Sequence, residues 1–392
     1  VLERDAGIRT SLIASTIENL WNSGEFESAL AMFPKLAATT DANEIAIGNK
    51  WRIPVSTESD DILWDNDVRI GNRDSVVINE MDIHRSTGNL FAALLYQGDG
   101  HTMQWSVNLS TDGGQNWQES YNWRANYNIN SLSMTVVGAH AYVAFSRGTN
   151  QDQAFLYQFR ASDGIQEDFN NGSPYVTVFT TSSPDFIKEV VLTSNADYYH
   201  DRLYYLAITN EGAFKAFWDD LFAISWTNYS PAVTDAERGL AACTNEGFSS
   251  EYLWVSFIDD TDSLKVYAVG NSDIWINYRN FYLNSSSTDY TAIGAYHDTI
   301  TCFFDYYAMS YGHIVYYMVS YNGGSSWLFG SVDDPNTMQE SPDITSRDGG
   351  GTGVIYRFYT PTRQERFVWR NYYGSWTSPV SARPLMTSGR RA

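Results

Sequence analysis

An apolar segment rich in aromatic and β-branched residues recurs along the chain about once every fifty residues. Such runs, bounded by Gly, Asn, Asp and Ser, are typical of β-strands. The six copies begin at residues 88, 139, 201, 251, 298 and 351, so their starts are separated by 51, 62, 50, 47 and 53 residues. They read GNLFAALLY, AHAYVAFSR, DRLYYLAIT, EYLWVSFID, DTITCFFDY and GTGVIYRFY. This period constrains the fold strongly, because each copy must belong to one unit that packs on its neighbours.

Each copy stands second in a group of strands. A further strand precedes it, such as VINEMDIH before residue 88, and a third follows it, such as MQWSVNLS. A fourth, less regular strand completes the group. Four-stranded units with this period predict the blades of a β-propeller. We therefore expect an all-β fold, a six-bladed β-propeller in which IAIGNKWRIPV could close the ring; a seventh blade built from residues 45–75 is the alternative.

The first forty residues have a different pattern. Apolar residues at helical spacing follow one another on two short stretches that Gly24 separates, and Pro34 limits the second. We predict a short α-helical hairpin over residues 1–40 and the propeller over residues 41–392. The hairpin resembles a single tetratricopeptide-type turn, and such repeats need stacked neighbours. We expect it to dock to a neighbouring subunit and to build a homo-oligomer; packing on the propeller is the alternative.

Two similar strings stand where a third strand turns into a fourth: STDGGQNW at residues 110–117, the first octapeptide, and SYNGGSSW at residues 320–327, the second octapeptide. Their paired glycines permit positive φ in a tight turn. The acid or amide in third place can accept hydrogen bonds from turn amides. We expect structural roles for Ser110, Asp112, Gly114, Trp117, Ser320, Asn322, Gly324 and Trp327.

The first octapeptide resembles the Asp box, S-x-D-x-G-x-x-W, of sialidase-like β-propellers, also known as the BNR repeat. The second octapeptide fits the same pattern with Asn322 in place of the acid. RASDG at residues 160–164 and NYYGSW at residues 371–376 look like eroded copies. The resemblance covers roughly residues 75–380. It implies the fold and says little about function, since Asp boxes lie far from sialidase active sites and occur in many other proteins.

The catalytic groups that this resemblance implies are not recognisable. Sialidases hold the substrate carboxylate with three arginines, the first of them in an Arg-Ile-Pro motif. WRIP occurs at residues 51–54, but Arg52 lies 36 residues before Gly88, and the family places the motif directly before the first blade's strands. We interpret the match as a coincidence. The family's Tyr nucleophile cannot be selected among 27 tyrosines, so the catalytic residues are left unassigned.

A propeller-type polysaccharide lyase is a second enzyme class to consider. Such an enzyme would use a His–Tyr pair, in which the His removes an acidic proton. Tyr198 with His200, and Tyr296 with His297, are the places where this chain offers such a pair. Histidines in strands and turns are more often structural, so this remains an alternative.

The mouth of the central channel is the usual binding surface of a propeller, and the starts of the innermost strands lie there. These starts carry a polar ring of mixed charge, without an arginine cluster. The candidate binding residues are Asn79, Glu80, Asn130, Lys188, Glu189, Glu237, Arg238, Tyr290 and Asp343. They either pair with one another along a wet channel or hold a glycan or a peptide.

Net charge and composition limit which classes of partner the chain can bind. The chain has 25 Lys and Arg against 46 Asp and Glu, a formal net charge of −21, which repels nucleic acid. Acidic loops at residues 59–67, 259–263 and 332–336 lack an EF-hand register, so we expect no cofactor, with calcium as the alternative. The sequence has no apolar run long enough to span a membrane. Cys243 and Cys302 either form a bridge or remain separate thiols.

The sequence thus favours a non-catalytic binding or assembly module that takes a glycan or a protein partner. The alternative is a carbohydrate-active enzyme, either a sialidase-like glycoside hydrolase or a propeller-type lyase. The chain opens with Val1, which a removed signal peptide or an expression fragment would explain. We expect a secreted or cell-surface protein.

Overall fold

The chain divides into two compact units, Val1–Asp65 and Asn66–Ala392, and every residue described below belongs to the second. The helical hairpin predicted for residues 1–40 and the WRIP motif lie outside the described residues. The computed structural model describes residues 70, 76–84, 86–97, 103–124, 129, 131–147, 152–196, 201–220, 225–245, 251–270, 274–283, 289–308, 312–332, 338–347, 351–360, 362–370 and 380–381.

The described residues form β-strands joined by turns and loops, and they contain no helix. The strands are β1 (Val76–His84), β2 (Asn89–Gln97), β3 (Met103–Ser110), β4 (Gln118–Arg124), β5 (Leu132–Val137), β6 (His140–Arg147), β7 (Gln153–Arg160), β8 (Gln166–Glu167), β9 (Val176–Thr180), β10 (Ile187–Ala196), β11 (Asp201–Thr209), β12 (Phe214–Asp220), β13 (Thr227–Asn228), β14 (Ala236–Thr244), β15 (Glu251–Asp259), β16 (Ser263–Gly270), β17 (Trp275–Tyr282), β18 (Thr291–Tyr296), β19 (Thr299–Ala308), β20 (Gly312–Ser320), β21 (Leu328–Ser331), β22 (Met338–Arg347), β23 (Gly351–Thr360), β24 (Thr362–Arg370) and β25 (Val380–Ser381). The all-β prediction is confirmed for this part of the chain.

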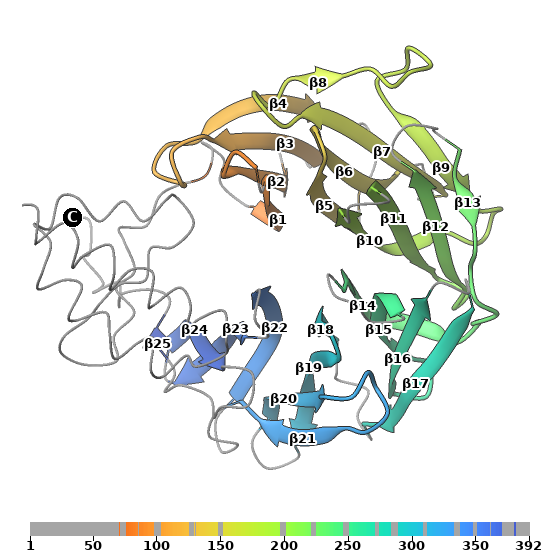
Figure 1. Ribbon diagram of the computed structural model, residues 1–392, viewed down its shortest axis with the longest axis vertical. Coiled ribbons are helices and arrows are strands. Elements are labelled where there is room, and N and C mark those ends of the chain that lie inside the picture. The colour runs from red at the N-terminus through yellow and green to blue at the C-terminus, as the bar shows by residue number, and fades with distance from the viewer. Residues whose placement is uncertain are drawn as a thin grey trace, which may run out of the picture. The chain divides into compact units, whose positions relative to one another are not determined.

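These strands pair into six antiparallel sheets. Five sheets have four strands in chain order, β1–β4, β10–β13, β14–β17, β18–β21 and β22–β25, and the sheet β5–β9 has five. The sheets follow one another around a central channel, with the first strand of each sheet innermost (Figure 1). This is the architecture of a β-propeller. The seventh-blade alternative concerns residues 45–75, of which only residue 70 is described, so the number of blades stays a prediction.

The second strand of each group is recognisable in the sequence because sheets pack against both of its faces. In β15 all six residues from Leu253 to Ile258 are buried, so the strand reads as a nearly continuous apolar run. The hydrophobic core therefore lies between successive sheets. Trp105 of β3, for example, packs its ring 5.3 Å from that of Phe145 and 5.1 Å from that of Tyr157, both in the next sheet.

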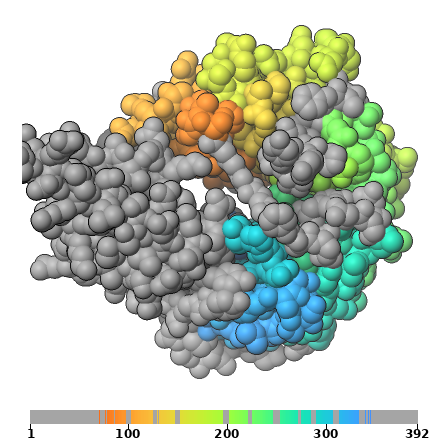
Figure 2. Space-filling model, in the orientation of Figure 1, coloured from red at the N-terminus to blue at the C-terminus, as the bar shows by residue number. Residues whose placement is uncertain are grey.

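The central channel is a hollow of about 770 Å³, which residues of the first strands line. The space-filling view shows an opening between the orange atoms of the β1–β4 sheet and the cyan atoms of the β18–β21 sheet, whose later strands are blue (Figure 2). No helix in the described part of the chain is long and apolar enough to cross a membrane.

Candidate functional site

The sheet β5–β9 differs from the other described sheets in its outer edge. Its third strand β7 pairs with β8 near one end, through Gln158 and Glu167, and with β9 near the other, through Leu156 and Val176. The intervening residues 168–175 form a loop that closes on itself, since the amide of Phe169 donates to the carbonyl of Ser173 at 2.8 Å. This inserted loop stands beside the next sheet, β10–β13, and forms one wall of a pocket.

The pocket, called here the inter-sheet pocket, has a volume of about 560 Å³ and lies between the sheets β5–β9 and β10–β13. Its walls combine aromatic side chains with hydrogen-bonding groups, the usual composition of a small-ligand site. The aromatic members are Tyr142, Phe169 and Trp226, and the polar members are His140, Gln158, Glu167, Asp168, Asn170 and Asp219.

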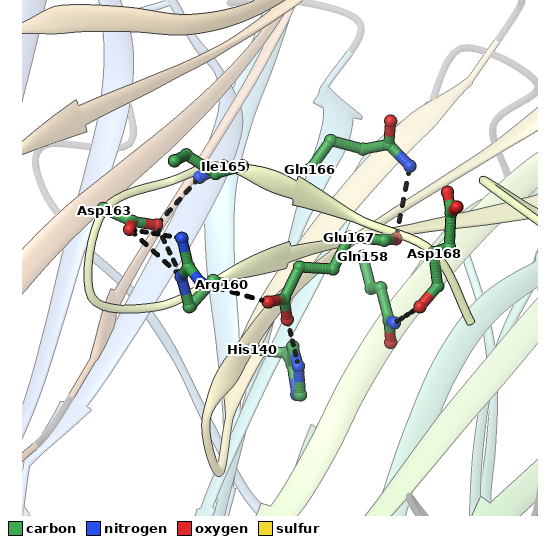
Figure 3. A network of polar contacts seen from close by, with 8 residues as sticks. All are labelled: His140, Gln158, Arg160, Asp163, Ile165, Gln166, Glu167 and Asp168. Carbon is green, nitrogen blue, oxygen red and sulfur yellow. Dashed lines mark hydrogen bonds and ion pairs between the residues drawn. The ribbon is translucent and has the colours of Figure 1, made fainter. Parts of the chain in front are cut away.

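The polar wall of the pocket is held by a network of side chains (Figure 3). Nε2 of His140 lies 2.9 Å from Oε2 of Glu167, and NH1 of Arg160 lies 3.4 Å from Oε1 of the same carboxylate. Arg160 also binds Asp163 at 2.6 Å. The hydrogen bond that Arg160 donates to the Asp163 carboxylate raises the pKa of Arg160 and lowers the pKa of Asp163, so both groups stay charged at neutral pH.

Two further contacts position the rest of the pocket. Nε2 of Gln158 donates to the carbonyl of Asp168 at 3.0 Å, which ties the inserted loop to β7. On the opposite wall, the ring of Trp226 meets Tyr205 edge to face at 6.2 Å. Asp219, only 7 % exposed, accepts a hydrogen bond from the amide of Ser225 at 3.4 Å. The pocket is therefore preformed, with its polar groups and its indole already oriented.

The central channel is the second concave feature, and its polar groups serve the first strands themselves. Oδ2 of Asp82 in β1 accepts the amide of Val136 at 2.7 Å and the hydroxyl of Thr135 at 3.2 Å, both in β5. Thr135 lies 3.0 Å from the hydroxyl of Ser194 in β10, whose carbonyl accepts from Thr244 in β14 at 2.6 Å. These side chains fasten each sheet to the next around the channel.

The structure brings two of the nine predicted channel-mouth residues into the channel lining, Glu80 and Glu189. Their chain neighbours Asn79 and Lys188 lie outside that lining, because successive side chains of a strand point to opposite faces. Asn130 lies outside the described residues, and so does the side chain of Asp343. Whether any of these residues binds a ligand stays a prediction.

The other three predicted residues also lie outside the described channel lining. Arg238 forms ion pairs with Glu237 and with Asp262, the latter at 2.6 Å. Tyr290 is 47 % exposed, and its amide donates to Asp305 at 3.0 Å. Arg238 and Glu237 are thus paired with each other, and Tyr290 makes a separate backbone contact. None of the described residues that line the channel is Lys or Arg.

The two octapeptides form similar turns between a third and a fourth strand. In the first, Oδ1 of Asp112 accepts the hydroxyl of Ser110 at 2.8 Å and the amide of Asn116 at 2.9 Å, and these hydrogen bonds lower the pKa of Asp112 to about 2. Nε1 of Trp117 donates to the carbonyl of Gly114 at 3.0 Å. In the second octapeptide, Oδ1 of Asn322 accepts the amide of Ser326 at 2.8 Å.

The structure also describes the two cysteines and one of the acidic loops. Both cysteines are free; burial raises the pKa of Cys302 to about 12 and that of Cys243 further above its usual value. Asp259, from one of the acidic loops, accepts hydrogen bonds from Thr261 and Ser263 within its own turn and pairs with Lys265 at 3.0 Å. Among the described residues no group of His, Cys, Asp and Glu is arranged to hold a metal ion.

Of the residues considered for a catalytic role, the structure describes only Tyr296 and His297. The rings of Tyr296 and His297 lie 4.4 Å apart at the turn between β18 and β19. Tyr198, His200 and Arg52 lie outside the described residues.

The inter-sheet pocket was not predicted from the sequence. Its key side chains come from β6, β8 and the segment before β13, and a two-residue strand such as β8 leaves no periodic pattern. One signal was present: the second and third apolar copies are separated by 62 residues, against 47–53 for the other intervals. The extra length contains the inserted loop.

No family model matches the chain, and no curated protein matches it in sequence. Among solved structures, a lectin from Burkholderia pseudomallei is similar with a TM-score of 0.56 and 13 % identity, over 79 % of this chain and 85 % of the lectin. A lectin from the fungus Aleuria aurantia, described as a six-bladed β-propeller with fucose recognition, gives a TM-score of 0.46 and 12 % identity, over 79 % and 96 %. Trypanosoma rangeli sialidase gives a TM-score of 0.47 and 10 % identity, and the match spans 77 % of this chain and 55 % of the sialidase. The likeness to the bacterial lectin shows a shared fold.

Proposed function

We propose that the protein is a non-catalytic carbohydrate-binding β-propeller whose ligand occupies the inter-sheet pocket. The observation that carries the proposal is the pocket itself, a preformed hollow of about 560 Å³ in which aromatic side chains face fixed hydrogen-bonding groups. A sugar ring presents an apolar face and a rim of hydroxyls, and this combination of walls suits both.

The roles of the individual groups follow from their chemistry. The Glu167 carboxylate can accept from two sugar hydroxyls, and its contacts with His140 and Arg160 already hold it in one orientation. Gln158 and Asn170 supply amides that both donate and accept. Trp226 offers a half-buried indole face for the apolar side of a sugar. Because these groups are fixed before the ligand arrives, little entropy is lost on binding.

The resemblance to the Burkholderia pseudomallei lectin supports the choice of ligand class, since that protein is a carbohydrate-binding protein of the same fold. Fold alone does not assign function, so the pocket and not the likeness carries the argument. The enzyme alternatives would need a converging arginine cluster or a His–Tyr base pair at the channel. The described channel lining contains Tyr296 but no arginine, which disfavours a sialidase-like site there, and the inter-sheet pocket favours binding.

Two predictions from the sequence accompany this proposal. We propose a location outside the cell, where a protein of this kind meets glycans. We also propose that residues 1–40 mediate assembly of several copies. Both rest on the sequence alone.

The proposal is tested by screening the protein on a glycan array and measuring each hit by isothermal titration calorimetry. Trp226→Ala should weaken binding of the best sugar by about fivefold, because an aromatic contact of this size is worth about 1 kcal/mol. Tyr282→Ala removes an aromatic ring that is 63 % exposed on another sheet and serves as the control. Thermal melting of both variants checks that they remain folded. Sugar binding that Trp226→Ala leaves unchanged would contradict the proposal.

A further inference from the structure

We propose that the inter-sheet pocket prefers a sugar that carries a protonated amine to the neutral sugar of the same configuration. This inference rests on the proposed function and names the ligand class within it. It follows from the charges that face the pocket, from the aromatic wall, and from the way in which each carboxylate is held.

The pocket is acidic. Three carboxylates line it, those of Glu167, Asp168 and Asp219, and none of its described lining residues is Lys or Arg. The guanidinium of Arg160 touches Glu167 at 3.4 Å but makes its shorter contact with Asp163, at 2.6 Å. The positive charge of Arg160 is thus shared between two acids, and Arg160 makes no described contact with the carboxylate of Asp168.

Asp168 presents a carboxylate that the described side chains do not neutralise. Its backbone carbonyl accepts the hydrogen bond from Gln158, and its carboxylate extends away from that contact (Figure 3). The residue is exposed at the edge of the pocket, and it is anchored through its backbone. A cation that enters the pocket therefore meets a carboxylate already placed beside it.

Asp219 and Trp226 supply the opposite wall. Asp219 is 7 % exposed and is held by the amide of Ser225, so it keeps its place without a ligand. The indole of Trp226 attracts a cation through its electron-rich face, and this attraction is strongest for Trp among the aromatic side chains. An ammonium group between a carboxylate and an indole gains from both contacts, whereas a hydroxyl gains only hydrogen bonds.

The same charges disfavour acidic sugars. A carboxylate on the ligand would be brought close to Glu167, Asp168 and Asp219, within a chain of formal net charge −21. Sialic and uronic acids should therefore bind more weakly than neutral sugars of similar size.

The test uses matched sugars that differ only in charge. For the gluco, galacto and manno configurations, the 2-amino-2-deoxyhexose, its N-acetyl derivative and the parent hexose are titrated into the full chain at pH 7 by calorimetry. For a configuration that binds, the amine should bind about fivefold tighter than the parent hexose, the ratio expected from one partly exposed ion pair. Added salt should lower that ratio, because exposed charges are screened.

Variants assign the effect to the pocket. Asp168→Asn should bring the ratio of the two affinities towards one. Asp260→Asn makes the same charge change at an exposed turn residue between β15 and β16, and should leave the ratio unchanged. Thermal melting shows whether both variants are folded, and Asp168→Glu should restore the preference.

The outcomes separate the two proposals. A parent hexose that binds as tightly as its amine, with both lost in Trp226→Ala, overturns the amine preference and leaves the carbohydrate site in place. A preference that persists in folded Asp168→Asn also overturns it. A panel in which no sugar binds, or in which a simple alkylamine binds and no sugar does, contradicts the proposed function itself.

Discussion

Nε2 of His140, the first residue of β6, lies 2.9 Å from Oε2 of Glu167, the last residue of β8. This contact joins the second strand of the sheet β5–β9 to the short outer strand that the inserted loop follows. It fixes the carboxylate at the centre of the polar wall of the inter-sheet pocket. Because both side chains are about one-third exposed, the pair contributes to the shape of the site more than to the stability of the fold.

Replacement of this carboxylate should separate binding from stability. Glu167→Ala should lower the free energy of unfolding by less than about 1 kcal/mol, since partly exposed ion pairs are worth little. The affinity for the bound sugar should fall by about tenfold, as expected when a charged acceptor of the ligand is lost. Calorimetric titration and chemical denaturation of the same sample measure both quantities. A large loss of stability with unchanged affinity would place Glu167 in the fold and not in the site.

The first octapeptide should contribute to acid stability. Hydrogen bonds from Asn116 and Ser110 hold the folded-state pKa of Asp112 at about 2, below its usual 3.8. A depressed pKa means that the contribution of Asp112 is present above pH 3.8 and is lost as the pH falls through about 2. Asp112→Asn should therefore show a smaller fall in melting temperature across this range than the unmodified protein.

The second octapeptide offers the matched control for that experiment. Asn322 already occupies the equivalent position and accepts the amide of Ser326 at 2.8 Å, so an amide keeps the turn closed. Asn322→Asp should add acid sensitivity where Asp112→Asn removes it. Identical acid profiles for all three proteins would show that these turns do not titrate with folding.

The two octapeptide turns should differ in how well the glycine at their fifth position tolerates a side chain. Gly114 and Gly324 have φ of 90° and 83°, so alanine is strained at both, by about 1–2 kcal/mol. A Cβ at residue 114 would meet only the flexible end of Leu90, at 3.3 Å. A Cβ at residue 324 would collide with the ring of Tyr278 and stand 2.9 Å from the indole of Trp254.

Gly324→Ala should therefore lower the free energy of unfolding by about 1–3 kcal/mol more than Gly114→Ala, the additional cost of overpacking a filled space. Denaturant unfolding of the two variants measures the difference directly. Equal losses would mean that Tyr278 and Trp254 move aside without cost.

The buried carboxylate of Glu189 links β10 to β14, and its replacement should destabilise the protein. Its carboxylate accepts the amides of Leu240 at 2.8 Å and Gly239 at 3.2 Å in β14, and burial raises its pKa although Lys188 and Arg238 lower it in part. Glu189→Ala leaves both amides without this acceptor and should cost about 1–3 kcal/mol for each. Glu189→Gln keeps an acceptor oxygen and should cost less.

The pH dependence of these variants has a definite sign. Because the folded pKa of Glu189 lies above its unfolded value of 4.5, the folded protein binds the proton more tightly, and stability rises as the pH falls through the folded pKa. The unmodified protein should therefore gain stability relative to Glu189→Gln as the pH is lowered from neutral towards 4.5. A difference that stays constant with pH would contradict the raised pKa.

The fold could be predicted from the sequence where packing leaves a pattern. Residues Leu253–Ile258 are buried on both faces because two sheets enclose β15, and the repetition of such mostly apolar runs predicts the strand groups. The candidate channel residues were harder to place, since Glu189 lines the channel and adjacent Lys188 does not. Side-chain alternation makes an error of one residue enough to select the wrong face.

The inter-sheet pocket could not be predicted in the same way. His140, Glu167 and Trp226 are separated by 27 and 59 positions in the chain, and each belongs to a different strand or turn. What brings them together is the inserted loop and its contact with the neighbouring sheet, which depends on tertiary packing. The long interval between two of the apolar copies marked the place of the insertion but not the side chains that it would supply.

A crystal structure of the protein with the tightest-binding sugar from the glycan screen would show directly whether the inter-sheet pocket is the binding site. We expect electron density for the sugar in the inter-sheet pocket, with its apolar face on Trp226 and a hydroxyl within hydrogen-bonding distance of Glu167. A sugar bound in the central channel, or at one of the octapeptide turns, with an empty inter-sheet pocket would contradict this expectation.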